Sequence, residues 1–330
     1  MNSPNLSIVI IARNEEDTLS RALPILAEEA SAENAEIIYV DSASSDGTME
    51  LIRRYPVTAV RLQASPLLCP SAGRYMGNLH SRGKFVYFLD GDMIPIKGWI
   101  RQGLAHFQDR PTLGGVIGRI YFVLPGEELN RNHPDDFPTG SVRGMGLSGI
   151  YRKDLFDRIG TFHPHARGEE EVELGYRIIR AGYTLERHDQ PMAYHLDKVK
   201  GKAEFDQKAK YFVGTGQVLR RSMGTELFWR LVLSTAPVFA QQAVVLIALI
   251  AIIVLLYQGN FPAALVVAAA GLLVLGGLLL WKGPERLYLR LRSLVLITRN
   301  IVRGFRMGLP EAAGFEDRLR FTVERPTAKL

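Results

Sequence analysis

Short apolar runs alternate with an amphipathic segment through the early part of the chain. Leu6–Ala12, Ile37–Val40 and Phe85–Leu89 are continuous apolar runs of strand length bounded by polar turns, so each is predicted to be a buried strand. Asp17–Glu29 carries apolar residues at helical spacing. Strands that alternate with helices pack into a mostly parallel sheet, so the pattern predicts an α/β domain.

Acidic turns follow the second and third of these strands. One turn runs from Asp41 to Thr48 and the other is Asp90-Gly91-Asp92. In open α/β sheets, ligands bind at the carboxyl ends of the strands. The sequence therefore predicts a ligand site where these two turns meet.

Two long segments in the second half of the chain have no charged side chain. Pro237–Tyr257 and Phe261–Trp281 are each 21 residues long, and only Gln258-Gly259-Asn260 separates them. A helix of this length is about 32 Å long, which is enough to cross the core of a bilayer. A transmembrane helical hairpin is predicted, with a buried helical hairpin of a soluble protein as the alternative.

Basic side chains flank this hairpin on both sides. Arg221 and Arg230 precede it, and Lys282 and Arg286 follow it. A hairpin returns the chain to the side from which it entered, and basic flanks favour the cytoplasmic side. We therefore expect a membrane protein with two spans, its α/β domain in the cytoplasm and a bacterial inner membrane as its location.

The segment of residues 283–309 is amphipathic. Four arginines share one side of its helical wheel: Arg292, Arg299, Arg303 and Arg306. Four apolar residues share the other side: Leu287, Leu294, Ile301 and Phe305. This pattern predicts a helix that lies in the membrane interface. A third span is the alternative, but it would place arginines inside the bilayer at a high cost.

The charge of the protein is unevenly distributed. The chain has 40 Lys and Arg against 34 Asp and Glu, and residues 282–330 carry 11 of the former and 5 of the latter. The whole net charge of +6 therefore lies in this tail. A basic segment after an apolar stretch favours anionic lipids as partners, and we expect no nucleic acid partner. The single cysteine, Cys69, excludes an internal disulfide and is interpreted as a small buried apolar residue.

The triplet Asp90-Gly91-Asp92 places two carboxylates at a strand end. Carboxylate oxygens are the ligands that Mg2+ and Mn2+ prefer, and such a pair suits a cation that bridges a diphosphate. A solvated turn is the alternative for this triplet taken alone.

The order of these motifs resembles glycosyltransferase family 2, which has the GT-A fold, over roughly residues 5 to 200. The resemblance rests on the strand and Asn-Glu turn of residues 7–16, the Asp-x-x-Ser-x-Asp-Gly-Thr turn of residues 41–48, the Arg-containing segment Ala72–Gly77 and the Asp-x-Asp triplet. Tyr75 stands where the family usually has Asn. The resemblance implies a GT-A domain that binds a nucleoside diphosphate sugar and a divalent metal, Mg2+ or Mn2+.

The resemblance also implies roles for individual residues. The donor-binding residues would be Asn14, Glu15, Asp41, Asp46, Arg74 and Asp90. Among them, Asp41 would face the base or ribose, Asp46 would support its turn, and Asp90 would approach the ribose or the metal. Asp92 would be the principal metal ligand, where the cation stabilises the departing diphosphate. Turn capping is the alternative for Asp41 and Asp46.

A cluster of carboxylates follows at residues 169–173, before Ala181-Gly182-Tyr183. It resembles the family's Glu-Asp motif on a helix that ends in Ala-Gly-Tyr, which places the motif at Glu170-Glu171. Transfer with inversion needs a carboxylate that accepts the proton of the acceptor hydroxyl. Glu171 is the first candidate for this base and Glu170 the second, and an acidic helix start is the alternative.

Two further features come from the same resemblance. His195 lies where many members of the family have a histidine near the diphosphate, so it is a candidate metal ligand, with a structural histidine as the alternative. The small residues of 144–149, with Gly144, Ser148 and Gly149, resemble a turn that lines the acceptor side.

Together these features predict a GT-A domain over residues 1–200, a juxtamembrane helical linker over 201–236, the transmembrane hairpin over 237–281, and a basic interfacial helix and tail over 282–330. The expected function is transfer of a sugar from a nucleoside diphosphate sugar to a lipid-linked or membrane-proximal acceptor. One alternative is a polyprenyl-phosphate sugar synthase, whose ionised acceptor needs no base. Another is a membrane protein that binds sugar nucleotides without catalysis.

Overall fold

The computed structural model of the protein describes residues 3–124, 126–129, 138–146, 148–196, 202–282 and 284–326. The chain divides into two compact units. The sheet unit consists of Met1–Val199 and Leu309–Leu330, and the helical unit consists of Lys200–Gly308. The two units are described separately below.

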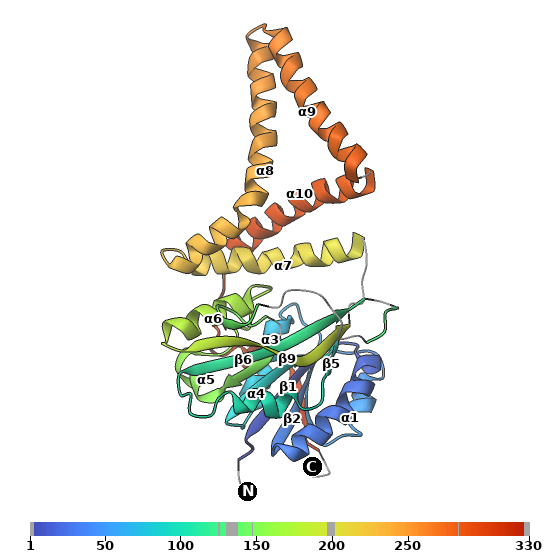
Figure 1. The fold of residues 1–330 in the computed structure, drawn as a ribbon, viewed down its shortest axis with the longest axis vertical. Helices are drawn as coiled ribbons and strands as arrows, with labels where there is room; N and C mark the ends of the chain where they lie inside the picture. Colours follow the sequence, from blue (N-terminus) through green and yellow to red (C-terminus); the bar gives the residue numbers. More distant parts are fainter. Residues whose placement is uncertain are drawn as a thin grey trace. The chain divides into compact units, whose positions relative to one another are not determined.

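The sheet unit is built on one mixed sheet, whose order in the described residues is β10-β3-β2-β1-β4-β8-β6-β9-β5, with β7 paired to β9 (Figure 1). The neighbours β3, β2, β1 and β4 run parallel to one another, and β8 and β10 are antiparallel to their partners. The strands are β1 (Leu6–Ala12), β2 (Ala35–Asp41), β3 (Val57–Leu62), β4 (Phe85–Asp90), β5 (Met93–Pro95), β6 (Leu113–Val123), β7 (Gly140–Val142), β8 (Gly149–Arg152), β9 (Thr184–Leu196) and β10 (Phe321–Glu324).

The helices of the sheet unit connect and cover these strands. They are α1 (Glu16–Ala32), α2 (Thr48–Ile52), α3 (Pro70–His80), α4 (Trp99–Ala105), α5 (Lys153–Ile159) and α6 (Glu170–Arg180), with a short 3-10 turn at Glu316–Arg318. The predicted helix Asp17–Glu29 lies inside α1. The predicted α/β class is therefore confirmed. The prediction of a mostly parallel sheet was wrong, because β5, β7, β8 and β10 pair antiparallel with their neighbours.

The core explains why these segments are strands. Every side chain of β1 is buried, because helices cover both faces of a parallel strand and an uninterrupted apolar run satisfies both faces. Aromatic rings fill the space beside β4: the Phe88 ring packs edge-on against the rings of Tyr151 and Phe162, at centroid distances of 6.0 and 5.0 Å. This packing fixes the end of β4, where the acidic triplet begins.

The end of the chain belongs to the sheet unit. β10 adds an antiparallel edge strand to β3, and Arg53 forms an ion pair with Glu324 at 2.9 Å. Phe315 is fully buried in the core. The predicted tail of residues 282–330 is therefore divided, because apolar side chains beyond residue 308 complete the core of the sheet unit.

The helical unit contains α7 (Lys202–Arg221), α8 (Glu226–Tyr257), α9 (Phe261–Lys282) and α10 (Pro284–Met307). α7 and α10 cross closely: a Cβ atom added to Gly216 would lie 2.0 Å from the carbonyl oxygen of Ile301, and one added to Gly304 would lie 1.9 Å from that of Val213. The side-chain amide of Asn300 also donates to the carbonyl of Ala209 at 2.8 Å. Glycines thus let the two backbones meet.

This packing changes the predicted faces of the amphipathic segment. Ile301 is buried as expected, but Phe305 is exposed, as are Arg299, Arg303 and Arg306. The reason is that glycines, and not large apolar side chains, form the contact of α10 with α7. The side chains of Leu287 and Leu294 lie outside the described residues.

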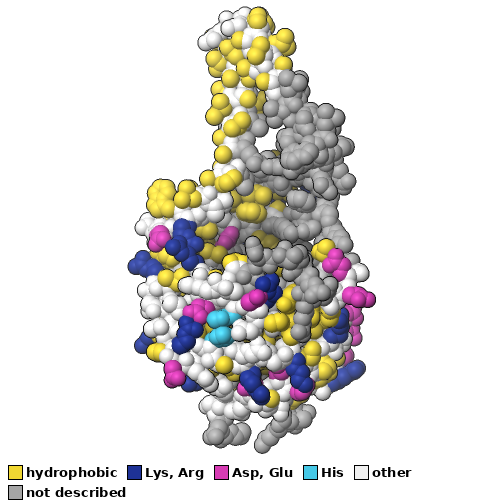
Figure 2. Space-filling model, in the orientation of Figure 1, with side chains coloured by type: hydrophobic (Ala, Val, Ile, Leu, Met, Phe, Trp, Pro, Cys, Tyr) yellow, Lys and Arg dark blue, Asp and Glu magenta, His cyan; other side chains and the backbone are white. Residues whose placement is uncertain are grey.

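The predicted spans Pro237–Tyr257 and Phe261–Trp281 fall within α8 and α9. In the part of the chain that the structure describes, no helix is both long enough and apolar enough to span a membrane. The prediction of two spans is therefore not confirmed. Apolar side chains are nevertheless exposed along α8, as the face drawn in Figure 2 shows.

Candidate functional site

The carboxyl ends of three neighbouring parallel strands bring the predicted residues together. The end of β1 lies between those of β2 and β4, with Ala12 opposite Asp41 and Ile11 opposite Asp90. The acidic turns after β2 and β4 therefore lie on either side of β1, at the edge where open α/β sheets bind ligands. This is the juxtaposition that the sequence predicts.

The turns after β1 and β2 are locked to each other. The backbone amide of Asn14 donates to the hydroxyl of Ser44 at 2.9 Å, and the Asn14 side-chain oxygen accepts from the amide of Ser45 at 2.8 Å. The amide of Glu15 donates to the Thr48 hydroxyl at 3.1 Å. Asn14 has a left-handed backbone (φ 58°), a conformation that Asn tolerates better than most residues. Asn14 and Glu15 thus shape the edge of the site.

Asp41 and Asp46 hold the second turn. The Asp41 carboxylate is fully buried, and both of its oxygens accept from the amide of Ser44 at 3.2 Å. Asp46 accepts from the amide of Thr48 at 3.1 Å. The structure therefore places Asp41 inside its own turn, where hydrogen bonds compensate its burial, and its role at the base or ribose stays a prediction.

A buried guanidinium connects three elements at the centre of the site. Arg74 of α3 is only 1% exposed, and its Nη2 donates to both oxygens of Asp90 at 2.7 and 3.0 Å. Its Nη1 donates to Oε1 of Glu170 at 3.0 Å. The Phe162 ring lies 5.3 Å from the guanidinium carbon, as in a cation–π contact.

Asp90 is engaged by Arg74, whose Nη2 bonds to both of its oxygens. The role of Asp90 as a metal ligand stays a prediction. Burial, opposed by the charge of Arg74, raises the pKa of Asp90 to about 6. Arg74 itself bonds to Asp90, another of the predicted donor-binding residues.

Burial raises the pKa of both carboxyl groups at the start of α6. For Glu171, burial first and then the charge of Glu170 raise the pKa to about 8. Burial also raises the pKa of Glu170, against the charge of Arg74, to which Glu170 is bonded. A carboxyl group with a pKa near 8 can exchange a proton near neutral pH, so Glu171 is a candidate proton acceptor.

A close backbone contact holds the start of α6 in place. A Cβ atom on Gly175 would lie 2.2 Å from the carbonyl oxygen of Arg143, and one on Gly144 would lie 3.4 Å from that of Glu171. Gly144 thus packs against the helix that carries the candidate base. Ser148 is buried and donates to the sulfur of Met93 at 3.2 Å, and its place on the acceptor side stays a prediction. Gly149 begins β8 inside the sheet.

Asp92 and His195 meet on neighbouring strands. β5 pairs with β9 so that Met93 lies opposite His195, and the Asp92 carbonyl accepts from the amide of Leu196 at 2.9 Å. His195 Nε2 lies 3.5 Å from Asp92 Oδ2. The Asp92 side chain is 33% exposed, so it is accessible from solvent.

These two side chains fit a hard divalent cation only in part. Among the described residues, no group of three or more His, Cys, Asp or Glu is arranged to hold a metal ion. A carboxylate and an imidazole nevertheless suit Mn2+ or Mg2+ when substrate phosphates and water supply the other ligands. Asp92 and His195 are thus the residues present that could hold such an ion.

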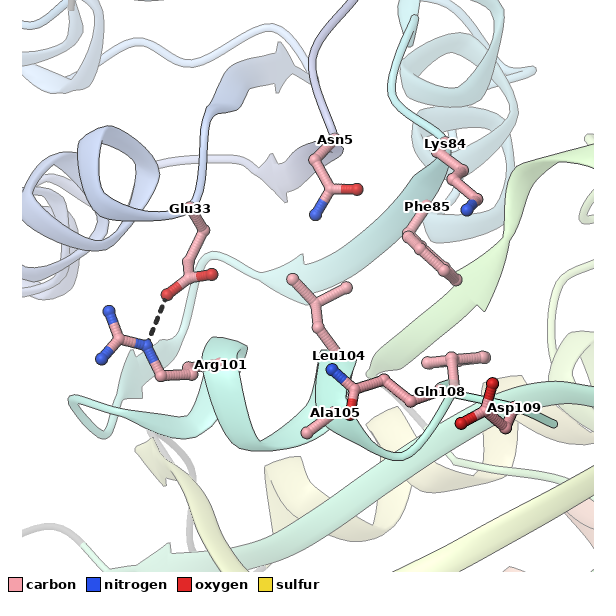
Figure 3. A pocket seen from close by; sticks show the side chains of 10 residues that line it. Asn5, Glu33, Lys84, Phe85, Arg101, Leu104, Ala105, Gln108 and Asp109 are labelled. Atoms are coloured by element: carbon pink, nitrogen blue, oxygen red, sulfur yellow. Dashed lines mark hydrogen bonds and ion pairs between the residues drawn. The ribbon is translucent and has the colours of Figure 1, made fainter.

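A cavity of about 450 Å³ lies at the opposite end of the strands (Figure 3). Asn5 and Lys84 on its wall immediately precede β1 and β4, and an ion pair joins Glu33 to Arg101 at 2.8 Å beside it. Because the acidic turns follow the other ends of these strands, this cavity is separate from the site described above.

The sequence analysis missed two residues of the site, Phe162 and Gly175. Phe162 packs against Arg74, and the sequence gives no sign of this contact, because an aromatic residue in a loop is usually interpreted as part of the core. Gly175 could have been found, because a glycine within an amphipathic helix indicates a close approach of another backbone.

Residues 7–170 match the family model "Glycosyl transferase family 2". The chain is 24% identical over 232 residues to the glycosyltransferase AglE of Haloferax volcanii, covering 65% of this chain and 73% of that protein. It is 28% identical over 156 residues to the pre-mycofactocin glycosyltransferase of Mycobacterium tuberculosis, covering 43% of this chain and 33% of that protein.

A solved structure has the same fold. The mannosyltransferase PcManGT from Pyrobaculum calidifontis, in complex with GDP-Man and Mn2+, superimposes with a TM-score of 0.61 at 18% identity, covering 92% of this chain and 88% of that one. At this identity the likeness concerns the fold, and it agrees with the predicted GT-A-like α/β architecture.

Proposed function

We propose that this chain, a transferase with a glycosyltransferase family 2 domain over residues 7–170, moves a sugar from a nucleoside diphosphate sugar to a lipid-linked or membrane-proximal acceptor. One observation carries the proposal: Arg74 joins Asp90 and Glu170 at the edge where the acidic turns meet, with Glu171 next to them. This arrangement supports a donor site and a base on adjoining elements.

Glu171 is the proposed general base. Its carboxylate accepts the proton of the acceptor hydroxyl while the acceptor oxygen forms a bond to the anomeric carbon. The bond between that carbon and the diphosphate breaks in the same displacement, so the configuration is inverted. Glu170 is the weaker candidate, because its Oε1 already accepts a hydrogen bond from Arg74.

Asp92 and His195 are the proposed ligands of Mg2+ or Mn2+. The cation would neutralise negative charge on the departing nucleoside diphosphate. The proposal is supported by the distance of 3.5 Å between His195 Nε2 and Asp92 Oδ2 and by the Mn2+ in the PcManGT complex. Arg74 contributes by fixing Asp90, whose backbone continues into Asp92.

The helical unit is the proposed membrane anchor. Large apolar side chains of α8 and α9 are well exposed, among them Val244, Ile247, Ile253, Leu265 and Val266. Exposed apolar surface of this extent is typical of a lipid or protein contact. We propose that the hairpin inserts in the membrane from the cytoplasmic side and that the arginines of α10 bind anionic lipid headgroups. Fractionation after a carbonate wash tests this, and recovery of the whole protein in the supernatant would reject it.

A thermal-shift screen of nucleoside diphosphate sugars, with and without Mn2+, identifies the donor. Transfer is then measured with the stabilising donor and a membrane lipid extract as acceptor source. The proposal predicts turnover that Glu171→Gln abolishes. Turnover that survives this change would favour a polyprenyl-phosphate acceptor, which is already ionised. Donor binding without turnover or hydrolysis would favour the non-catalytic alternative.

A further inference from the structure

The C-terminal segment of the sheet unit inserts one aromatic side chain beside the candidate site. Between α10 and β10, the chain turns at Gly314, whose φ of 66° lies in the left-handed region, and continues into the short 3-10 turn Glu316–Arg318. Phe315, between them, has no exposed surface. Connecting segments usually run over the protein surface, so a fully buried ring in this one indicates that the segment packs into the sheet unit.

The Phe315 ring contacts two elements that are far apart in the sequence. It packs edge-on against the Tyr75 ring at a centroid distance of 5.6 Å and against the His165 ring at 4.9 Å. The neighbouring Glu316 accepts a hydrogen bond from the Tyr75 hydroxyl at 2.9 Å. Tyr75 is therefore held by both residues, which gives a physical reason for a tyrosine at the position where the family usually has Asn.

Both elements carry the charged cluster. Tyr75 directly follows Arg74 on α3, and His165 belongs to the loop of residues 160–169 that leads into Glu170 and Glu171. The same loop is tied to the start of α3, since the Cys69 thiol donates to the carbonyl oxygens of Pro164 and Ala166 at 3.3 Å. Phe315 therefore contacts both α3, which carries Arg74, and the loop that leads into Glu170. The distance between these two segments determines whether Arg74 can bond to Glu170.

We propose that Phe315 and Glu316 form a positioning brace that holds α3 and the 160–169 loop in register, so that Arg74, Glu170 and Glu171 keep their catalytic arrangement. This inference rests on the proposed function. The brace acts through Tyr75 and His165, which Phe315 and Glu316 contact. A displacement of a base by about 1 Å can lower a rate about 100-fold, so contacts that hold these segments in place can have a large effect on turnover.

The main test compares Phe315→Ala with Leu319→Ala, assayed in the full-length protein well below either melting temperature. Both changes truncate a buried apolar side chain of the same segment, but Leu319 has no role in the brace. Phe315→Ala should lower kcat about 10-fold or more and leave KM for the donor within about 2-fold. Leu319→Ala should keep kcat within about 2-fold while it lowers the melting temperature. Equal kcat values in the two variants would overturn the proposal.

The pH profile gives a readout that loss of stability alone would not move. Glu171 is surrounded by Glu170, Arg74, Asp90 and Tyr151. If the loop loosens and water enters, the pKa of Glu171 moves toward its ordinary value, so the acid limb of the kcat profile should shift to lower pH in Phe315→Ala. An unchanged limb would contradict a role in positioning.

Glu316 is tested by two variants. Glu316→Gln keeps an oxygen that accepts from the Tyr75 hydroxyl, and Glu316→Ala does not. The brace predicts that Gln retains at least about half of the kcat and that Ala loses about 5-fold. Equal effects of the two changes would remove Glu316 from the proposal.

Hydrogen–deuterium exchange separates this proposal from the proposed function. Faster exchange of residues 160–175 in Phe315→Ala than in Leu319→Ala would support the brace even if no donor is turned over. Transferase activity in the wild type with identical exchange in both variants would reject the brace and leave the proposed function standing.

Discussion

Replacing Glu171 with Gln should make the protein inactive and more stable at the same time. Burial and the charge of Glu170 raise the pKa of Glu171 from 4.5 to about 8. The folded protein therefore retains a proton that the unfolded chain releases as the pH rises above 4.5. Stability is accordingly lost as the pH rises from 4.5 to about 8, and it changes no further above that range.

The size of this loss follows from the shift. Each pKa unit corresponds to about 1.36 kcal/mol, so the shift to about 8 corresponds to roughly 5 kcal/mol above pH 8 and roughly 3 kcal/mol at pH 7. These figures are upper bounds, because part of the Glu171 side chain reaches the surface and water screens its charge. Gln has no proton to lose, so Glu171→Gln should match the wild type near pH 4.5 and exceed it increasingly toward pH 8.

The assay is thermal unfolding of both proteins from pH 5 to pH 9. A gain of about 3 kcal/mol in a unit of this size raises the melting temperature by roughly 6 to 12 °C. Glu170→Gln is the matched comparison: it removes the charge from the ion pair with Arg74 and should lower the melting temperature at pH 7. In the transfer assay, kcat/KM of the wild type should rise about tenfold per pH unit below 8, and Glu171→Gln should lose at least about 100-fold.

Two results would refute this reasoning. A melting temperature of Glu171→Gln that follows the wild type in parallel across the whole pH range would mean that Glu171 has an ordinary pKa. A gain in stability with full activity would mean that the carboxylate is buried but is not the base.

Three further changes test other parts of the site. Asp92→Asn should abolish both turnover and the Mn2+-dependent thermal shift with donor, whereas the exposed Asp109→Asn should change neither; full activity of Asp92→Asn in EDTA would reject the metal ligand. Arg74→Ala should destabilise the sheet unit by about 3 to 5 kcal/mol in denaturant titrations, because it leaves Asp90 and Glu170 buried without their partner; a loss below about 1 kcal/mol would contradict the network. Gly175→Ala should lower the melting temperature through its clash with Arg143, whereas Gly271→Ala, which meets open space in a helix, should not; equal effects would argue against the close contact.

The local pattern of the sequence predicted the strands of the site well. Continuous apolar runs identified β1, β2 and β4, and the order of the acidic turns placed Asp90 at the edge of the sheet. The sequence did not predict which charged side chains of the site bond to each other. Both Asp90 oxygens bond to Arg74, 16 positions away in the chain, and Glu170 bonds to the same guanidinium from 96 positions away. Such contacts depend on how α3 and α6 approach each other, which no local pattern encodes.

The C-terminal segment is a second case in which the local sequence pattern did not predict which side chains are buried. Its basic composition suggested a surface tail, and charge is a poor guide to which apolar residues a segment buries. Phe315 and Leu319 are two apolar side chains among charged neighbours, yet both lie in the core of the sheet unit. Their periodicity is too short to predict a helix or strand, so their burial becomes visible only when β10 pairs with β3.

The charge count of the cluster gives a physical reason for its raised pKa values. Asp90, Glu170 and Glu171 together bring three acidic groups to one guanidinium, that of Arg74. Direct bonds to Arg74 oppose the rise that burial causes in the pKa of Asp90 and of Glu170. The pKa of Glu171, about 8, lies above that of Asp90, about 6. Because the charge of Glu170 contributes to the raised pKa of Glu171, we expect a second cation placed beside Glu170 to lower the pKa of Glu171 and to move the acid limb of the activity profile to lower pH.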